Sequence, residues 1–172
     1  MRIGILSKLA AAGVLCAAIA MASAPLEAQA GAKVLRPADM QTLIPSSVFY
    51  RGQTATTQVR NSGGVKFGDG YFVLACLVDT GGYSNQIASR YQGYFITEIP
   101  IRIGGKELHA GAYGIGFVAN SRFLVTDVGG HEVLSVDSAT DSGLKRPMPL
   151  QVQANGSGFR LYAGRRYVTF TR

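Results

Sequence analysis

YFITEIPIRIGGKELHAGAYGIGFVANSRFLVTDVGGHEVLSV, residues 94–136, is the stretch that decides the fold. Apolar, β-branched and aromatic residues fill short runs at 94–103, 108–118, 123–128 and 133–136, and Gly-Gly or Asn-Ser pairs separate these runs. Such runs with turn residues between them are typical of successive antiparallel strands. We therefore predict a β-meander that forms the spine of one domain.

The rest of the chain extends this pattern. Residues 71–78, YFVLACLV, are apolar on both alternating faces, which predicts a central strand that is covered on both sides. Short helices are expected at 37–44 and after Ser84, which can act as an N-cap. The predicted fold is mainly β, an antiparallel β-barrel-like fold or β-sandwich of about 8–10 strands with one or two short helices. Further strands are expected at 47–51, 54–60, 150–154, 159–162 and 167–171, with turns at 61–64 and 155–158.

The N-terminus has the features of a secretory signal. Arg2 and Lys8 give a basic start, residues 9–21 an apolar run, and Ala28-Gln29-Ala30 a small-residue cleavage site. We predict a cleaved signal peptide at 1–30 and a single β-domain with a short N-terminal leader at 31–172. The expected localisation is secreted or periplasmic, with association to the outer membrane as an option.

Cleavage of the signal peptide would change the number of cysteines in the mature protein. Cleavage removes Cys16 and leaves Cys76 without a partner for an internal disulfide. Cys76 lies in the most apolar strand, where a small buried residue is expected. The domain must then be stabilised by its hydrophobic core, which about 140 residues can supply.

The positive charge is concentrated near the C-terminus. The whole chain carries a net charge of +7, yet residues 31–144 hold nine basic and nine acidic side chains. A basic end favours anionic partners, such as an anionic component of the cell envelope, and peripheral contact with a membrane. A solvated surface that keeps the protein soluble is the alternative, and export argues against nucleic acid. The residues predicted to bind an anionic surface are Lys145, Arg146, Arg160, Arg165 and Arg166.

The strand predicted at 110–117 contains glycines, which have no side chain to pack and need an explanation. Gly114 and Gly116 share one face with Ala112, and glycine weakens a strand. The structural explanation is a bend or the close approach of a neighbouring element. The functional explanation is that the glycines leave room for a small-molecule ligand. A pocket, if present, would be lined by Tyr113, Phe117, Phe123 and Tyr94, with Arg102 or Arg122 at its mouth.

Few residues offer catalytic chemistry. Asp127 and His131 flank the Gly129-Gly130 turn, and with His109 they form the acid–base set of an enzyme alternative. The two histidines lie in different loops without metal-ligand spacing, so we expect no metal and no cofactor.

Residues 94–136, with IPIRIGG, AGAYGIGF and VTDVGGHE, resemble segments of uncharacterised small secreted bacterial β-proteins. The resemblance covers about a quarter of the chain and implies a β-barrel or sandwich in the envelope. We expect an exported, envelope-associated binding or interaction module without catalysis, which contacts anionic surfaces through its basic C-terminal hairpin. The alternatives are a small β-barrel enzyme with an acid–base site near His131 and Asp127, and a small outer-membrane β-barrel.

Overall fold

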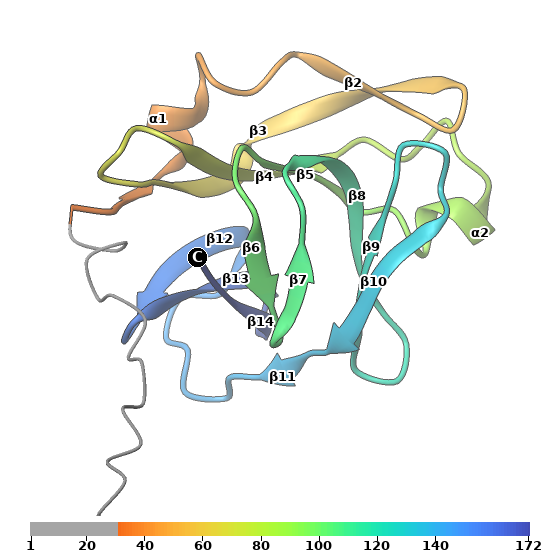
Figure 1. The fold of residues 1–172 in the computed structure, drawn as a ribbon. Coiled ribbons are helices and arrows are strands. Elements are labelled where there is room, and N and C mark those ends of the chain that lie inside the picture. Colours follow the sequence, from red (N-terminus) through yellow and green to blue (C-terminus); the bar gives the residue numbers. More distant parts are fainter. Residues whose placement is uncertain (1–30) are drawn as a thin grey trace, which may run out of the picture.

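Two antiparallel sheets build the protein, and each contributes one face to a shared core (Figure 1). The computed structural model describes residues 31–172, so the predicted signal peptide lies outside the described residues. Within this range ten strands have four or more residues, and four more have two or three. The prediction of a mainly β, sandwich-like fold is confirmed, and the described strands do not close into a barrel.

The first sheet has eight strands in the order β1-β3-β4-β5-β8-β9-β10, and β2 pairs with the N-terminal half of β3. Helix α1 spans Pro37–Met40 between β1 and β2, and α2 spans Asn85–Ala88 between β4 and β5. The strands are β1 (Lys33–Leu35), β2 (Ser47–Tyr50), β3 (Gln53–Lys66), β4 (Phe72–Val78), β5 (Gly93–Thr97), β8 (Gly111–Val118), β9 (Arg122–Thr126) and β10 (Glu132–Asp137).

The second sheet has six strands in the order β12-β13-β14-β6-β7, and β11 pairs with β14. Its strands β6 and β7 come from the middle of the chain, so the C-terminal hairpin pairs with a segment about 65 residues earlier through Phe170 and Ile103. The strands are β6 (Ile101–Ile103), β7 (Lys106–Leu108), β11 (Ala139–Thr140), β12 (Met148–Asn155), β13 (Gly158–Gly164) and β14 (Arg166–Thr171).

The run at 94–103, predicted as a strand that Pro100 interrupts, is divided between the two sheets, because the chain changes sheet within it. β5 ends at Thr97 in the first sheet, and β6 begins at Ile101 in the second. Pro100 has no N–H to donate to a ladder, so a strand cannot run through it undisturbed. The Thr97 hydroxyl donates to the carbonyl of Ile99 at 2.5 Å and stabilises the corner.

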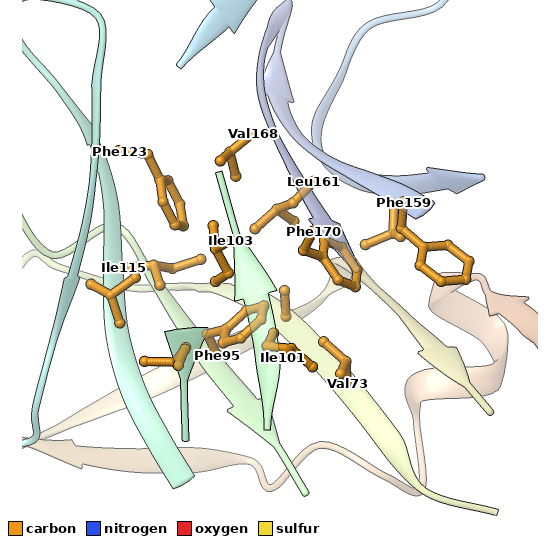
Figure 2. Packing of buried hydrophobic residues seen from close by; sticks show 14 of the residues in the cluster. Val73, Phe95, Ile101, Ile103, Ile115, Phe123, Phe159, Leu161, Val168 and Phe170 are labelled. Atoms are coloured by element: carbon orange, nitrogen blue, oxygen red, sulfur yellow. The ribbon is translucent and has the colours of Figure 1, made fainter. Parts of the chain in front are cut away.

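The main hydrophobic core fills the space between the sheets. Figure 2 shows Phe95 and Ile115 of the first sheet facing Ile103 and Phe170 of the second, and all four side chains are at most 2% exposed. The side chains alternate along each strand, so every second residue of these strands enters this core. The alternation predicted for the meander is therefore confirmed.

The first sheet is also covered on its outer face. Ala75 of β4 faces the second sheet, whereas Cys76 faces a smaller cluster that includes Met40 of α1. A third cluster lies under the β2–β3 hairpin and α2. The prediction that residues 71–78 form a strand covered on both sides is confirmed.

The predicted turn at 61–64 is wrong, because β3 continues through it from Gln53 to Lys66. A bulge between Gln58 and Ser62 bends the strand instead. The glycines allow close backbone approach: a Cβ on Gly63 would lie 3.0 Å from the amide nitrogen of Val152 on β12, and one on Gly64 would lie 2.5 Å from the carbonyl oxygen of Val73.

Close approach also explains the bare positions on β8. A Cβ on Gly114 would lie 2.6 Å from the ring of Tyr50 and 2.9 Å from that of Tyr91, and one on Gly116 would overlap the carbonyl oxygen of Arg90. The segment after α2 therefore rests directly on the β8 backbone. The structural explanation for these glycines is confirmed.

Candidate functional site

The four aromatic side chains expected to line a pocket do not share one. Phe117 and Phe123 pack inside the core between the sheets, with ring centroids 4.9 Å apart. Tyr113 packs at the edge of the same core, whereas Tyr94 packs against the clusters on the outer face of the first sheet. These residues fill the core, and they come from both faces of the first sheet.

The two arginines expected at the mouth of that pocket are engaged locally. Arg102 donates a 2.6 Å hydrogen bond to the carbonyl of Gly105 in the β6–β7 turn. Arg122 forms a 2.6 Å ion pair with Asp137 and donates to the hydroxyl of Ser135, both on the neighbouring strand β10. Each guanidinium thus stabilises its own hairpin.

Asp127 and His131 do meet. The His131 backbone N–H donates to one oxygen of the Asp127 carboxylate at 2.9 Å, and Nδ1 of the ring lies 3.0 Å from the other. These bonds from His131 hold the pKa of the Asp127 carboxyl below its usual value. Both side chains are exposed, 84% for His131 and 43% for Asp127, so solvent surrounds the pair.

His109 lies apart from this pair. Its Nδ1 is 3.8 Å from a carboxylate oxygen of Glu107 at the end of β7, and no hydrogen bond or ion pair within residues 31–172 joins the two histidine–carboxylate pairs. In the same range, no three His, Cys, Asp or Glu side chains are placed to hold a metal ion. The three residues considered for acid–base chemistry therefore form two separate exposed pairs.

The arginines of the C-terminal hairpin make intramolecular bonds. Arg160 lies over the ring of Tyr167, 4.3 Å from its centroid, and 3.6 Å from the Asp141 carboxylate. Arg165 donates to three carbonyl oxygens of the loop before β12, those of Asp141, Ser142 and Leu144.

Arg166 reaches across to the other sheet. It donates to the carbonyl oxygens of Phe117, Val118 and Arg122, and to the hydroxyl of Ser138. All three hairpin arginines, at 160, 165 and 166, therefore contribute to holding the domain together, whatever else they contact.

Lys145 and Arg146 differ from the other residues predicted to bind anions. Both are exposed, and neither side chain makes a hydrogen bond or ion pair within the described chain. Their loop is fixed to β12, because the side-chain amide of Gln151 donates to the carbonyl of Arg146 at 3.2 Å. The free cations are thereby placed next to β12.

A groove of about 570 Å³ lies between β1 and α1 on one side and β12 on the other, and we call it the β1–β12 groove. It lies where an edge strand of the first sheet passes an edge strand of the second. Its lining consists of Val34, Leu35, Arg36, Pro37, Ser62, Met148, Gln151, Val152, Gln153 and Ala154.

The β1–β12 groove combines an apolar floor with a polar rim. Leu35 and Val152 are buried in its floor, and Met148 is 38% exposed to solvent beside them. The amides of Gln151 and Gln153 bond to each other at 3.1 Å along one wall. Arg36 lies on the opposite wall, and the backbone of the loop that carries Lys145 and Arg146 is bonded to Gln151 on the β12 wall.

The sequence analysis predicted the strand and the cations on the β12 side of this site, but not the wall formed by β1 and α1. The stretch at 150–154 was predicted as an edge-like strand, and Lys145 and Arg146 were predicted to bind anions. The other wall was missed, because the predicted turn at 61–64 left no reason for β1 and β12 to lie side by side. The close approach of Gly63 to Val152 sets that arrangement, and glycine in a strand-like context is the signal that could have revealed it.

Comparison with known protein families, curated proteins and solved structures found no match. Within residues 31–172, no helix is long and apolar enough to span a membrane. The function must therefore be inferred from the groove and the charged groups themselves.

Proposed function

We propose that the chain is exported and acts as an envelope-associated binding module, without catalysis, for an anionic lipid with a single acyl chain. The β1–β12 groove is the observation that supports this proposal. It places an apolar floor beside Arg36 and close to the loop of Lys145 and Arg146, two exposed cations that form no ion pair within the described residues.

The size and lining of the groove favour a small molecule with an apolar part. Its volume of about 570 Å³ falls within the range of about 300–1,000 Å³ that is usual for ligand pockets. An acyl chain that covers Met148, which is 38% exposed, would remove apolar surface from water, which stabilises a complex by about 25 cal/mol per Å² buried.

The charge on the rim favours an anionic head group. Arg36 lines the groove, the loop that carries Arg146 is bonded to its β12 wall, and the six basic residues after position 144 leave this end of the chain with an excess of positive charge. A phosphate attached to the acyl chain would lie beside these cations while the chain occupies the floor. Part of its affinity should then depend on ionic strength.

Binding of two matched lipids tests the proposal. Isothermal titration calorimetry would compare lysophosphatidylglycerol with lysophosphatidylcholine, which have the same acyl chain but differ in net charge. We expect the anionic lipid to bind more tightly at low salt, and this preference to shrink at high salt. Equal affinity for both lipids at low salt would contradict the role of the rim cations.

Three variants separate the floor from the rim. Met148→Glu should weaken both lipids, because it places a charge in the apolar floor, and its exposed position should leave the fold intact. Arg146→Ala should weaken the anionic lipid alone. Arg102→Ala is the control, since it removes the same charge at the β6–β7 turn, away from the groove lining. If Met148→Glu binds both lipids like the wild type, the groove is not the binding site.

A further inference from the structure

A second, smaller cavity is lined by residues of the β2–β3 turn, of α2 and the segment after it, and of the β9–β10 turn. Figure 1 shows where these elements lie in the fold. Its volume is about 210 Å³, and two arginines, Arg51 and Arg90, contribute to its lining. None of its residues lines the β1–β12 groove. The remaining lining residues are Tyr50, Gln86, Ile87 and Gly130.

The backbone holds Arg51 in an unusual conformation. Arg51 and Gly52 form the two-residue turn between β2 and β3 with φ angles of 49° and 80°. Both values are left-handed, as in the type I′ turns that favour Asn, Asp or Gly. An L-residue with a Cβ is sterically disfavoured in this region. Arginine is therefore locally unfavourable at this position.

The neighbouring turn accommodates the Arg51 side chain. The Arg51 N–H donates to the carbonyl of Val128 at 2.8 Å, which joins the two turns. The aliphatic stem then lies over Gly130, and a Cβ on that glycine would come within 2.6 Å of Cδ of Arg51. Gly130 itself has a φ of 87°, so this position requires glycine for two reasons. The stem is thus held in place beside the cavity.

The guanidinium of Arg51 has no intramolecular partner within residues 31–172. It makes no hydrogen bond and no ion pair there, although the residue is fixed at both its backbone and its stem. Local strain that internal contacts do not explain is often associated with a binding function. The arrangement presents a pre-positioned cation at the cavity.

Arg90 provides the second cation. Its carbonyl fits against the bare Gly116 of β8, which fixes the backbone. Its guanidinium is 51% exposed and lies 3.6 Å from a carboxylate oxygen of Glu132. Strong charge-assisted hydrogen bonds are shorter, about 2.7–2.9 Å, and exposed pairs of this kind contribute little. Glu132 is therefore a weak partner that another anion can displace.

We propose that Arg51 and Arg90 bind a tetrahedral oxyanion, a phosphate or sulfate group, in this cavity, and that Glu132 competes with it for Arg90. Two guanidinium forks match the geometry of such an anion. The cavity is smaller than the roughly 300–1,000 Å³ of pockets for drug-sized ligands, so it accommodates the anion alone or the anionic end of a larger molecule. This site is independent of the β1–β12 groove.

Titration with inorganic phosphate tests the proposal. Amide and arginine Nε–H shifts of the purified protein would be followed by two-dimensional NMR, with sulfate and acetate for comparison. We expect saturable shifts at Arg51, Gly130 and Arg90 with phosphate and sulfate, and much smaller ones with acetate. A parallel titration with glycerol 3-phosphate shows whether a phosphate ester binds more tightly than the free anion. Absence of saturable shifts at these residues with both phosphate and sulfate would overturn the proposal.

Two variants should change the affinity for phosphate in opposite directions. Arg51→Asn should weaken phosphate binding by about 10-fold or more, since a charge-assisted bond is lost. Because asparagine suits the left-handed turn, the same variant should fold at least as stably as the wild type. Glu132→Gln should strengthen binding several-fold, because the competing carboxylate is removed. Arg60→Gln is the control, since Arg60 is exposed on β3 and does not line the cavity. Equal losses in Arg51→Asn and Arg60→Gln, or weaker binding in Glu132→Gln, would overturn the proposal.

Discussion

Arg166 donates a 2.7 Å hydrogen bond from its guanidinium to the backbone carbonyl of Val118, and this bond joins the two sheets. Val118 is the last residue of β8 in the first sheet, and Arg166 is the first residue of β14 in the second. The same guanidinium bonds to the carbonyls of Phe117 and Arg122, and it lies 5.5 Å from the centroid of the Phe117 ring. One side chain thus satisfies three carbonyl oxygens at the end of the β8–β9 hairpin.

Arg166→Ala should lower the free energy of unfolding by about 2–4 kcal/mol, because four hydrogen bonds from a charged donor are lost and three backbone carbonyls each lose a donor. Urea denaturation followed by circular dichroism measures the change. Arg146→Ala is the matched control, since its side chain makes no bond in the described chain, and it should change stability by less than about 0.5 kcal/mol. Similar small effects in both variants would show that Arg166 does not join the sheets.

Gly116→Ala should destabilise the protein by about 2–3 kcal/mol, because a Cβ at this position overlaps the Arg90 carbonyl, which is backbone and cannot rotate away. Gly143→Ala is the control: its new methyl would meet Asp141 at an ordinary 3.5 Å, and its φ is not left-handed. Thermal unfolding compares the two. Equal melting temperatures would mean that the segment after α2 does not rest on β8.

The glycines show what the sequence could and could not predict. Gly114 and Gly116 alternate with large apolar residues, so close approach of a neighbour was predictable, although the identity of that neighbour was not. Gly63 and Gly64 follow Asn61-Ser62, a typical turn signal, and the contact with β12 that keeps them in a strand is long-range. Local signals therefore gave the strand content, and contacts distant in sequence set the bend of β3 and the β1–β12 groove.

Arginines mark a second limit of prediction from sequence. The alternation of Arg160 with Phe159 and Leu161 correctly predicts which face each side chain occupies, but not which acceptor a long, flexible side chain reaches. Arg165 and Arg166 are neighbours in sequence, yet one bonds to the loop before β12 and the other to the opposite sheet. The distribution of charge along the sequence located the basic end of the chain. The three-dimensional arrangement was needed to tell which of its cations form intramolecular bonds and which do not.

Tyr91→Phe should raise the free energy of unfolding by about 1 kcal/mol, because it removes a buried hydroxyl that has no hydrogen-bond partner in the described chain. Burial raises the pKa of this hydroxyl well above its usual value, so it stays protonated and needs an acceptor. Its ring stacks on that of Tyr50 at 3.7 Å, and phenylalanine preserves this contact.

Tyr50→Phe is the natural comparison for that variant, since the Tyr50 hydroxyl is bonded to the Thr126 hydroxyl at 2.9 Å. Losing this bond should destabilise the protein by about 1 kcal/mol. The two substitutions delete the same atom from stacked rings but should shift the urea midpoint in opposite directions. A loss of stability in Tyr91→Phe would indicate that its hydroxyl has a partner, such as a buried water.

Cys76 should make stability fall as the pH rises above about 9. Burial raises the pKa of the thiol from 9.0 to about 12, so between these values the unfolded chain releases a proton that the folded chain retains. The folded state then binds more protons than the unfolded state, and the free energy of unfolding decreases with pH. The unfolded thiol is half ionised at pH 9 and about nine-tenths ionised at pH 10, so this thiol alone should account for a loss of about 1 kcal/mol between these two pH values.

Cys76→Ala isolates this contribution, because the tyrosines that titrate in the same range are present in both proteins. Urea denaturation at pH 7, 7.5, 9 and 10 should show the wild type losing stability faster than the variant above pH 8, and a constant difference between the two proteins at pH 7 and pH 7.5. The native thiol should also react with a disulfide reagent only on the timescale of unfolding, since the thiolate is the nucleophile and Cys76 is fully buried. Rapid labelling of native protein at pH 8, or identical pH dependence in both proteins, would mean that Cys76 is accessible to solvent.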